Sequence, residues 1–262
     1  MALPIASLTG TPYEIAAGPP PLAVRHAAPP VFAYDWNAFR VTVTTNPTTM
    51  GRTHVTSAQN AAGDTIFLPF QQNQVHSVYI QTGLAYAAGV RGFITVNLSG
   101  CRLYIDRVTG SNDLIIYHAN ALAIGPYIKP GQVAPLNPPD PLDMDKETVA
   151  RAQALDAQHT NARAYWISAA PGPALNNPTT IAALGATTYY TSAVRAVQAQ
   201  LDAGKTGVDF WGGVAVIGEL VPGGWQISWQ TYGDTTYTGP GAGKALAAAN
   251  MTVLATGQLR TQ

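Results

Sequence analysis

The chain has 262 residues, enough for one large domain whose core needs neither a disulfide nor a metal to fold. Hydrophobic residues make up 47% of it and charged residues only 11%, so most of its polarity comes from uncharged side chains. Its 14 basic and 14 acidic side chains give a formal net charge of zero and form no basic stripe, which excludes nucleic acid as an expected direct ligand.

Residues 1–30 are rich in alanine and proline, including three consecutive prolines at 19–21. This composition predicts a flexible leader, with a targeting segment as the alternative. No basic segment followed by an apolar one marks a secretory signal peptide, and no apolar run approaches the ~20 residues that cross a bilayer. We therefore expect no membrane span and no readable signal peptide.

Short runs with β-branched residues follow, separated by turn signals. Alternating apolar and polar side chains, or a short apolar run, predict a strand at each of five places. The five predicted strands cover residues 39–44, 65–68, 92–98, 101–106 and 113–118. Turn residues at Asn46-Pro47, 62–64 and 109–112 end or connect them.

The middle of the chain has a different character. Six prolines between residues 119 and 142 predict an irregular surface connection. A helix is then predicted over 145–158, with Asp145 as its N-cap, and a second over 191–203 that ends before Gly204.

The C-terminal part returns to β patterns. Residues 214–217 and 225–229 flank a Val-Pro-Gly-Gly turn and predict a hairpin, and residues 251–258 predict a last strand. The sum is an α+β fold, a sandwich of mixed β-sheets flanked by helices. We expect one domain over 31–262, with a proline-rich and helical insertion at about 120–204.

The single cysteine, Cys101, lies on a predicted strand whose hairpin partner carries His118, 17 residues further on. A thiol needs a base to become a nucleophile at neutral pH, and histidine is the usual one. With a two-residue loop in the hairpin, facing residue numbers sum to 219 and Cys101 stands opposite His118. With a four-residue loop they sum to 221, so that Cys101 faces Asn120 and His118 lies diagonally across. Both registers put thiol and imidazole on one face, about 5–8 Å apart at Cβ, whereas an odd loop separates them unless a bulge intervenes.

Residues just before the cysteine complete a candidate site. Gly100 lets the backbone turn sharply and lets a substrate approach closely, and the amides of Gly100 and Cys101 would face a developing oxyanion. The Thr95 hydroxyl, six residues upstream of the cysteine, would hydrogen-bond the imidazole and fix its tautomer. The alternative is that Cys101 is a small buried hydrophobe and His118 a structural residue.

Cysteine and histidine usage limits the other possibilities. One cysteine permits no intramolecular disulfide and suits a reducing place of action. The remaining histidines show no metal-ligand spacing, and neither a CxxC nor an HExxH motif is present. We therefore expect neither a metal nor an organic cofactor.

The segment Leu98-Ser99-Gly100-Cys101, with Thr95 before it and His118 after it, resembles the bacterial glutamine deamidase toxins. This family includes the cytotoxic necrotizing factor catalytic domains and Burkholderia lethal factor, the nearest resemblance, and is related to the chemoreceptor glutamine deamidases. The strand at 93–98 and the aromatic-Leu-Pro-aromatic segment at 67–70 also match the family pattern. The resemblance covers about residues 35–120 and, more loosely, 205–262.

The resemblance implies a thiol site of Cys101, His118 and Thr95, with the backbone at Ser99 and Gly100 beside the oxyanion. It implies a deamidase-toxin-like fold and a toxin or effector, secreted by a bacterium without a readable signal peptide, that acts in the host cytoplasm. Its partner would be a host protein with a target glutamine, and the candidate is the translation initiation helicase eIF4A. Deamidation of this helicase would inhibit translation. The leader and the 120–200 region depart from the family pattern, which leaves the substrate open.

Other functions remain open at this stage. A transglutaminase would use the same thioester with an amine in place of water. A non-catalytic binding module could display an aromatic cluster, for which core packing is the ordinary explanation: Trp225, Trp229, Tyr232 and Tyr237. A peptidase is less well supported, since no acidic residue stands at a telling spacing. Asp106, Asp113 and Asp209 receive no role because turns collect aspartates.

Overall fold

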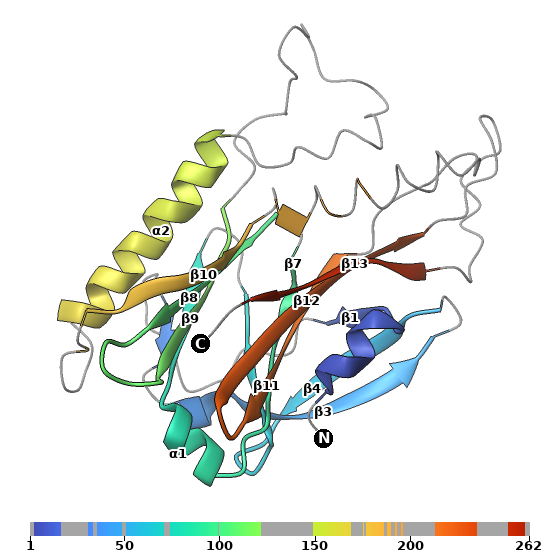
Figure 1. Ribbon diagram of the computed structural model, residues 1–262, viewed down its shortest axis with the longest axis horizontal. Helices are drawn as coiled ribbons and strands as arrows, with labels where there is room; N and C mark the ends of the chain where they lie inside the picture. Colours follow the sequence, from blue (N-terminus) through green and yellow to red (C-terminus); the bar gives the residue numbers. More distant parts are fainter. Residues whose placement is uncertain are drawn as a thin grey trace, which may run out of the picture.

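The computed structural model describes residues 3–16, 31–33, 36–48, 51–70, 74–98, 100–121, 149–168, 175, 177–185, 188–189, 192, 195, 213–234 and 251–259. Strands dominate these residues and form two sheets, one of eight strands and one of five. The sheets pack face to face, and α2 (Val149–Ser168) lies along the outer face of the smaller one (Figure 1). The expected α+β class is therefore confirmed.

The larger sheet is mixed. Its order is β1-β4-β3-β5-β7-β11-β12-β13, with β1–β4 and β5–β7 parallel and the other pairs antiparallel. Its strands are β1 (Tyr13–Ile15), β3 (Arg40–Pro47), β4 (Thr53–Gln59), β5 (Thr65–Leu68), β7 (Gly92–Leu98), β11 (Gly213–Val221), β12 (Gly224–Asp234) and β13 (Met251–Leu259).

The smaller sheet carries His118 of the candidate site, whereas Thr95 lies on the larger sheet. Its order is β10-β8-β9-β6-β2, and only β2–β6 is parallel among its pairs. Its strands are β2 (Val31–Ala33), β6 (Val75–Ile80), β8 (Arg102–Arg107), β9 (Leu114–Ala119) and β10 (Thr179–Leu184). The short helix α1 (Thr82–Ala87) connects β6 to β7, and the 3-10 turns are η1 (Ile5–Thr9) and η2 (Trp36–Phe39).

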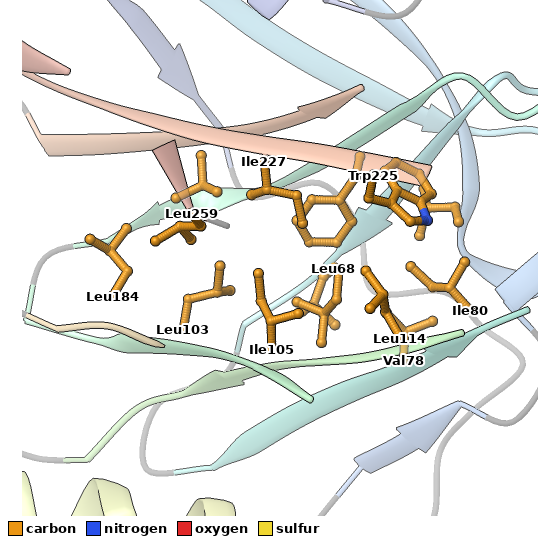
Figure 2. Packing of buried hydrophobic residues seen from close by; sticks show 14 of the residues in the cluster. Leu68, Val78, Ile80, Leu103, Ile105, Leu114, Leu184, Trp225, Ile227 and Leu259 are labelled. Carbon is orange, nitrogen blue, oxygen red and sulfur yellow. The ribbon is translucent and has the colours of Figure 1, made fainter. Parts of the chain in front are cut away.

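Apolar side chains from the inner faces of both sheets fill the space between them (Figure 2). Trp225 and Ile227 come from the larger sheet, and Val78, Leu103 and Ile105 from the smaller one. Alternate residues of β6, β8 and β9 point the other way, where they pack against α2. Removing this apolar surface from water is the main stabilising contribution, at about 25 cal/mol per Å².

Part of the predicted leader belongs to the core. Leu8 of η1, and Tyr13 and Ile15 of β1, pack with Val55 and Ile217 on the outer face of the larger sheet. The prediction of a flexible leader over residues 1–30 is therefore wrong for 3–16, because three spaced apolar side chains find this sheet face despite the alanine- and proline-rich composition. Residues 17–30 lie outside the described residues.

Most predicted strands, and the C-terminal hairpin, are confirmed to within a few residues. Asn46-Pro47 is not a turn: both residues extend β3 and pair with His54 and Thr53. Proline is tolerated there because β5 pairs with β3 only at Arg40 and Val41, so among the described residues the C-terminal end of β3 has a strand on one side only. The reversal comes after it, where the Thr48 amide donates to the Arg52 carbonyl (2.8 Å).

The helical region also differs from the prediction. The helix expected over 145–158 is observed over Val149–Ser168, because no glycine or proline interrupts the chain before Pro171. Asp145, Gly204 and most of 191–203 lie outside the described residues. Within the range predicted as an insertion, α2 and β10 both pack on or pair with the smaller sheet.

Candidate active site

The candidate nucleophile stands where the chain passes from one sheet to the other. β7 belongs to the larger sheet and β8 to the smaller one, and Cys101 immediately precedes β8. Its side chain is 2% exposed and joins the core between the sheets. His118 lies on β9, next to β8, and Thr95 lies on β7, so the three predicted catalytic residues come from both walls of the sandwich.

The hairpin register settles how the cysteine faces the histidine. Leu103 pairs with His118 and Arg102 with Ala119, so that facing residue numbers sum to 221. The Val108 amide donates to the Asp113 carbonyl and closes the four-residue turn (3.0 Å). Continued by one residue, this register puts Cys101 opposite Asn120, with His118 diagonally across, and the alternative register with a sum of 219 is wrong.

Thr95 and His118 meet as the sequence predicts. The Thr95 hydroxyl donates its one proton to the Leu68 carbonyl (2.7 Å), and its oxygen lies 2.7 Å from Nδ1 of His118. Because that proton is already used, the threonine oxygen must accept from an N–H at Nδ1. The other ring nitrogen, Nε2, then carries a lone pair and can take a proton, as a general base must.

Burial keeps the His118 imidazole neutral. The side chain is fully buried, and Phe70 stacks on it with ring centroids 5.5 Å apart. Burial, together with the neighbouring His76 imidazole, lowers the pKa of His118 to about 3. Among the described residues, Nε2 has no hydrogen-bond partner. The site thus holds a base with its lone pair unused at neutral pH.

Asn120 contacts the sulfur, a role that the sequence analysis did not assign. Its side-chain amide donates to Sγ of Cys101 (2.9 Å). The Asn120 amide N–H donates to the Gln74 carbonyl (2.9 Å), and Gln158 of α2 donates to the Asn120 carbonyl (3.0 Å). These bonds hold the residue just beyond β9. The signal available in the sequence was its place opposite Cys101 in the four-residue-loop register.

Gly100 has the backbone conformation that its predicted role requires, and its amide, which is predicted to face an oxyanion, already has a partner. Its backbone φ of +97° is one that residues other than glycine rarely adopt, and a Cβ at this position would stand 2.5 Å from Nη1 of Arg151. Its amide donates to the Tyr189 hydroxyl (2.9 Å), which in turn donates to the Cys101 carbonyl (3.1 Å). The Gly100 N–H is therefore engaged and would reach an oxyanion only after Tyr189 moves.

Leu98 and Ser99 are the other two residues of the motif. Leu98 is fully buried at the end of β7 and packs in the core between the sheets. Its part in the motif is therefore to anchor the strand from which the chain crosses to Cys101. Ser99 lies outside the described residues, so its predicted place beside the oxyanion stays a prediction.

Of the three aspartates without an assigned role, the two that the structure describes do not join this site. Asp106 points to the opposite face of β8, where it binds Arg163 and His159 of α2. Asp113 accepts hydrogen bonds from the Tyr79 hydroxyl and the Thr82 amide at the start of α1. Asp209 lies outside the described residues.

The aromatic cluster proposed for a binding module is mostly core. Trp225 and Trp229 are 2% and 5% exposed and pack between the sheets, and Tyr232 is fully buried. These three side chains cannot anchor a partner from the surface, so core packing accounts for them. Tyr237 lies outside the described residues.

The described part of the chain shows neither a metal-binding cluster nor a helix that could cross a membrane. No three His, Cys, Asp or Glu side chains there gather as a metal ion would need. No helix among those residues is long and apolar enough to cross a membrane. The chain matches no known protein-family model, and no curated protein sequence matches it. Functional assignment therefore depends on the geometry around Cys101.

Removing the donor at the sulfur should make the thiol harder to ionise. In an Asn120→Leu variant the thiolate loses a hydrogen bond, and a bond to a charged group contributes about 1.5–3 kcal/mol. We expect the pH at which alkylation of Cys101 reaches half its maximal rate to rise by about one unit or more. The measurement is the rate of iodoacetamide alkylation between pH 5 and 10, followed by intact mass.

Gln158→Ala is the matched control for this experiment, since Gln158 bonds the Asn120 backbone and not the sulfur. Because the donor to the sulfur is kept, its alkylation profile should shift by much less than that of Asn120→Leu. An unchanged profile in Asn120→Leu, with the variant folded, would show that the contact to the sulfur has no electrostatic effect.

Proposed function

We propose that the protein is a cysteine-dependent amidohydrolase that deamidates a glutamine side chain of another protein. The observation that carries the proposal is the orientation of His118: Thr95 holds its Nδ1–H, and the ring, whose Nε2 has no partner among the described residues, lies on the same inner face as Cys101. A base with a fixed tautomer beside a thiol is the arrangement that nucleophilic catalysis by cysteine requires.

The reaction would proceed through a thioester. Nε2 of His118 takes the Cys101 proton, and the sulfur forms a bond to the glutamine amide carbon. The C–N bond then breaks as His118 returns the proton to the departing nitrogen, which leaves as ammonia. Water, deprotonated by His118, attacks the thioester carbon; the C–S bond breaks, the proton returns to sulfur, and glutamate is released.

Donors to the intermediate must be found within the site. Asn120 already contacts the sulfur and would stabilise the thiolate before the attack. The Cys101 amide, and the Gly100 amide once Tyr189 has moved, would donate to the developing oxyanion. Because Cys101 is only 2% exposed, a substrate can reach it only when side chains above it move.

The resemblance to the glutamine deamidase toxins supports the same activity. The motif residues Leu98, Gly100 and Cys101 lie at the junction of two mixed sheets, and Thr95 and His118 converge there. We propose on this basis a deamidase-toxin-like fold and an effector that acts in a host cytoplasm. The candidate substrate is the translation initiation helicase eIF4A. Conversion of glutamine to glutamate places a negative charge where a neutral amide stood and would disable a buried site of the target.

Peptide mass spectrometry of treated host-cell lysate tests the proposal. Lysate is incubated with wild-type protein or with Cys101→Ser, and peptides are searched for a gain of about one dalton at glutamine, the mass signature of amide-to-acid conversion. We expect one or a few peptides to shift with the wild type alone. The shifted peptide also identifies the target, including whether it is eIF4A.

Two other outcomes of the lysate experiment would change the proposed activity. Incorporation of a labelled primary amine in place of the one-dalton shift would make the protein a transglutaminase, which uses the same Cys101 thioester. The absence of any Cys101-dependent change, with both proteins folded by circular dichroism, would contradict the proposed activity.

A further inference from the structure

A second buried histidine stands beside the candidate site. His76 on β6 pairs directly with His118 on β9, and β9 separates β6 from β8, the strand that follows Cys101. His76 and His118 face each other in register, and Cys101 lies diagonally beyond His118, so the three residues form a slanted row over three neighbouring strands. With strands ~4.8 Å apart and a shift of two residues at ~3.4 Å each, the ends of this row are about 12 Å apart at the backbone.

His76 points into the space between the sheets. Its neighbours at alternate positions, Val78 and Ile80, pack in the core between the sheets. Val75 and Tyr79 pack under α2, and Ser77 accepts a hydrogen bond from Trp166 of that helix. Strand alternation therefore puts the imidazole on the inner face, the face that also carries His118.

The His76 ring lacks the partners that a buried imidazole needs. It is only 4% exposed, and within the described residues neither Nδ1 nor Nε2 has a hydrogen-bond partner. Nε2 of the adjacent His118 is in the same situation. Buried polar atoms are nearly always paired, and an exception in a folded protein points to a bound water or ligand. Three ring nitrogens that are unpaired among the described residues therefore mark a place suited to a polar molecule.

The chemistry of the row indicates which molecule fits. Burial lowers the pKa of His76 to about 4 and that of His118, with the added effect of His76, to about 3. Both rings are therefore neutral at pH 7, and a neutral imidazole offers one N–H donor and one lone pair. A primary carboxamide presents the complementary groups. A carboxylate does not, because it has no donor and finds no positive charge in the row.

We propose that His76 contacts the substrate: one of its ring nitrogens hydrogen-bonds the primary carboxamide that Cys101 attacks, which makes the space beside His118 the carboxamide subsite. The preference for amide over carboxylate also favours release of the glutamate product. This inference rests on the proposed function, and it adds the residue that recognises the reacting group.

A His76→Phe variant tests the subsite without the need for turnover. Phenylalanine keeps the ring shape and removes both nitrogens. The probes are iodoacetamide, which carries a primary carboxamide, and methyl methanethiosulfonate, which carries none. We expect the ratio of their second-order rates at Cys101 to fall about tenfold, the effect of one hydrogen bond. His76→Gln, which restores a polar side chain, should recover part of the ratio.

Two controls separate recognition from folding. Ser77→Ala changes the neighbouring side chain on the opposite face and should leave the ratio unchanged. The melting temperature of His76→Phe should equal or exceed that of the wild type, because two unpaired buried nitrogens are removed. An unchanged ratio, or a melting temperature lowered by more than a few degrees, would overturn the proposal.

The two hypotheses can fail independently. A ratio that falls while lysates show no deamidation would keep the subsite and reject the proposed reaction. Deamidation that proceeds at the wild-type rate in His76→Phe would keep the reaction and reject the subsite.

Discussion

An enzyme without the His118 imidazole should lose almost all of its activity. Replacing His118 with asparagine removes the group that takes the Cys101 proton and returns it to the leaving nitrogen, a contribution of about 10²- to 10⁴-fold in rate. We expect kcat/KM for glutamine deamidation to fall by that factor, measured as ammonia release from the target identified in lysate. His54→Asn, at a half-buried histidine that contacts Glu14 away from this site, should retain full activity.

Thr95 offers a graded version of the same experiment. Thr95→Val keeps the shape but loses the hydroxyl that holds Nδ1–H of His118, so the ring can adopt the tautomer that has no lone pair at Nε2. Activity should fall in Thr95→Val and be largely kept in Thr95→Ser. Equal activity in Thr95→Val, Thr95→Ser and the wild type would show that the hydroxyl does not orient the base.

The pH profile gives an independent check on His118. A general base works only when unprotonated, and burial and the neighbouring His76 lower the pKa of His118 to about 3. The acid limb of kcat/KM should therefore lie well below the ordinary histidine value of 6.5. An acid limb near pH 6.5 would show that His118 is solvated in the working enzyme, or that another group is the base.

The hairpin that carries the site could be predicted because its determinants are local. Turn residues at 109–112 and the alternation on either side fix two strands, and an even loop length puts Cys101 and His118 on one face. The sequence did not decide between loops of two and four residues, because several residues in that stretch suit a turn. In the structure the hairpin has the four-residue loop, which is closed by the hydrogen bond between Val108 and Asp113.

The residues that sequence analysis missed come from distant elements. His76 meets His118 only through the pairing of β6 with β9, and Tyr189 reaches Gly100 from 89 positions away. Arg151 lies against Gly100 because α2 packs on the smaller sheet. Such contacts depend on strand order and helix docking, which periodicity does not encode. The same cause explains why Leu8 and Ile15 were assigned to a leader, since the sheet that buries them is formed by later residues.

The buried ion cluster beneath α2 should dominate the effect of single substitutions on stability. Asp106 is fully buried and accepts two hydrogen bonds from Arg163 (2.7 Å each) and one from Thr180 (2.9 Å), with His159 3.2 Å away. Asp106→Asn leaves the Arg163 guanidinium without its counter-charge, and removing one partner of a buried pair costs about 3–5 kcal/mol. Urea unfolding should show a loss of that size. Alkylation of Cys101 in the folded protein should not change, because Asp106 faces away from it.

Asp156→Asn on the same helix is the matched control. Asp156 also accepts hydrogen bonds from an arginine and a tyrosine, but its side chain is 57% exposed, so the loss should stay below about 1 kcal/mol. Equal losses in Asp106→Asn and Asp156→Asn would mean that burial adds nothing to the Asp106 cluster.

The pH dependence of unfolding should distinguish the Asp106 charge from packing. Burial alone would raise the pKa of Asp106, but hydrogen bonds and charge from His159 and Arg163 outweigh it and lower the pKa from 3.8 to about 2. A carboxylate with a lowered pKa stabilises the folded protein above its unfolded-state pKa, and this contribution is lost as the pH falls. The stability difference between the wild type and Asp106→Asn should therefore be constant above about pH 5 and shrink between pH 4 and 2. A difference that persists unchanged to pH 2 would assign the effect to lost packing and not to the buried charge.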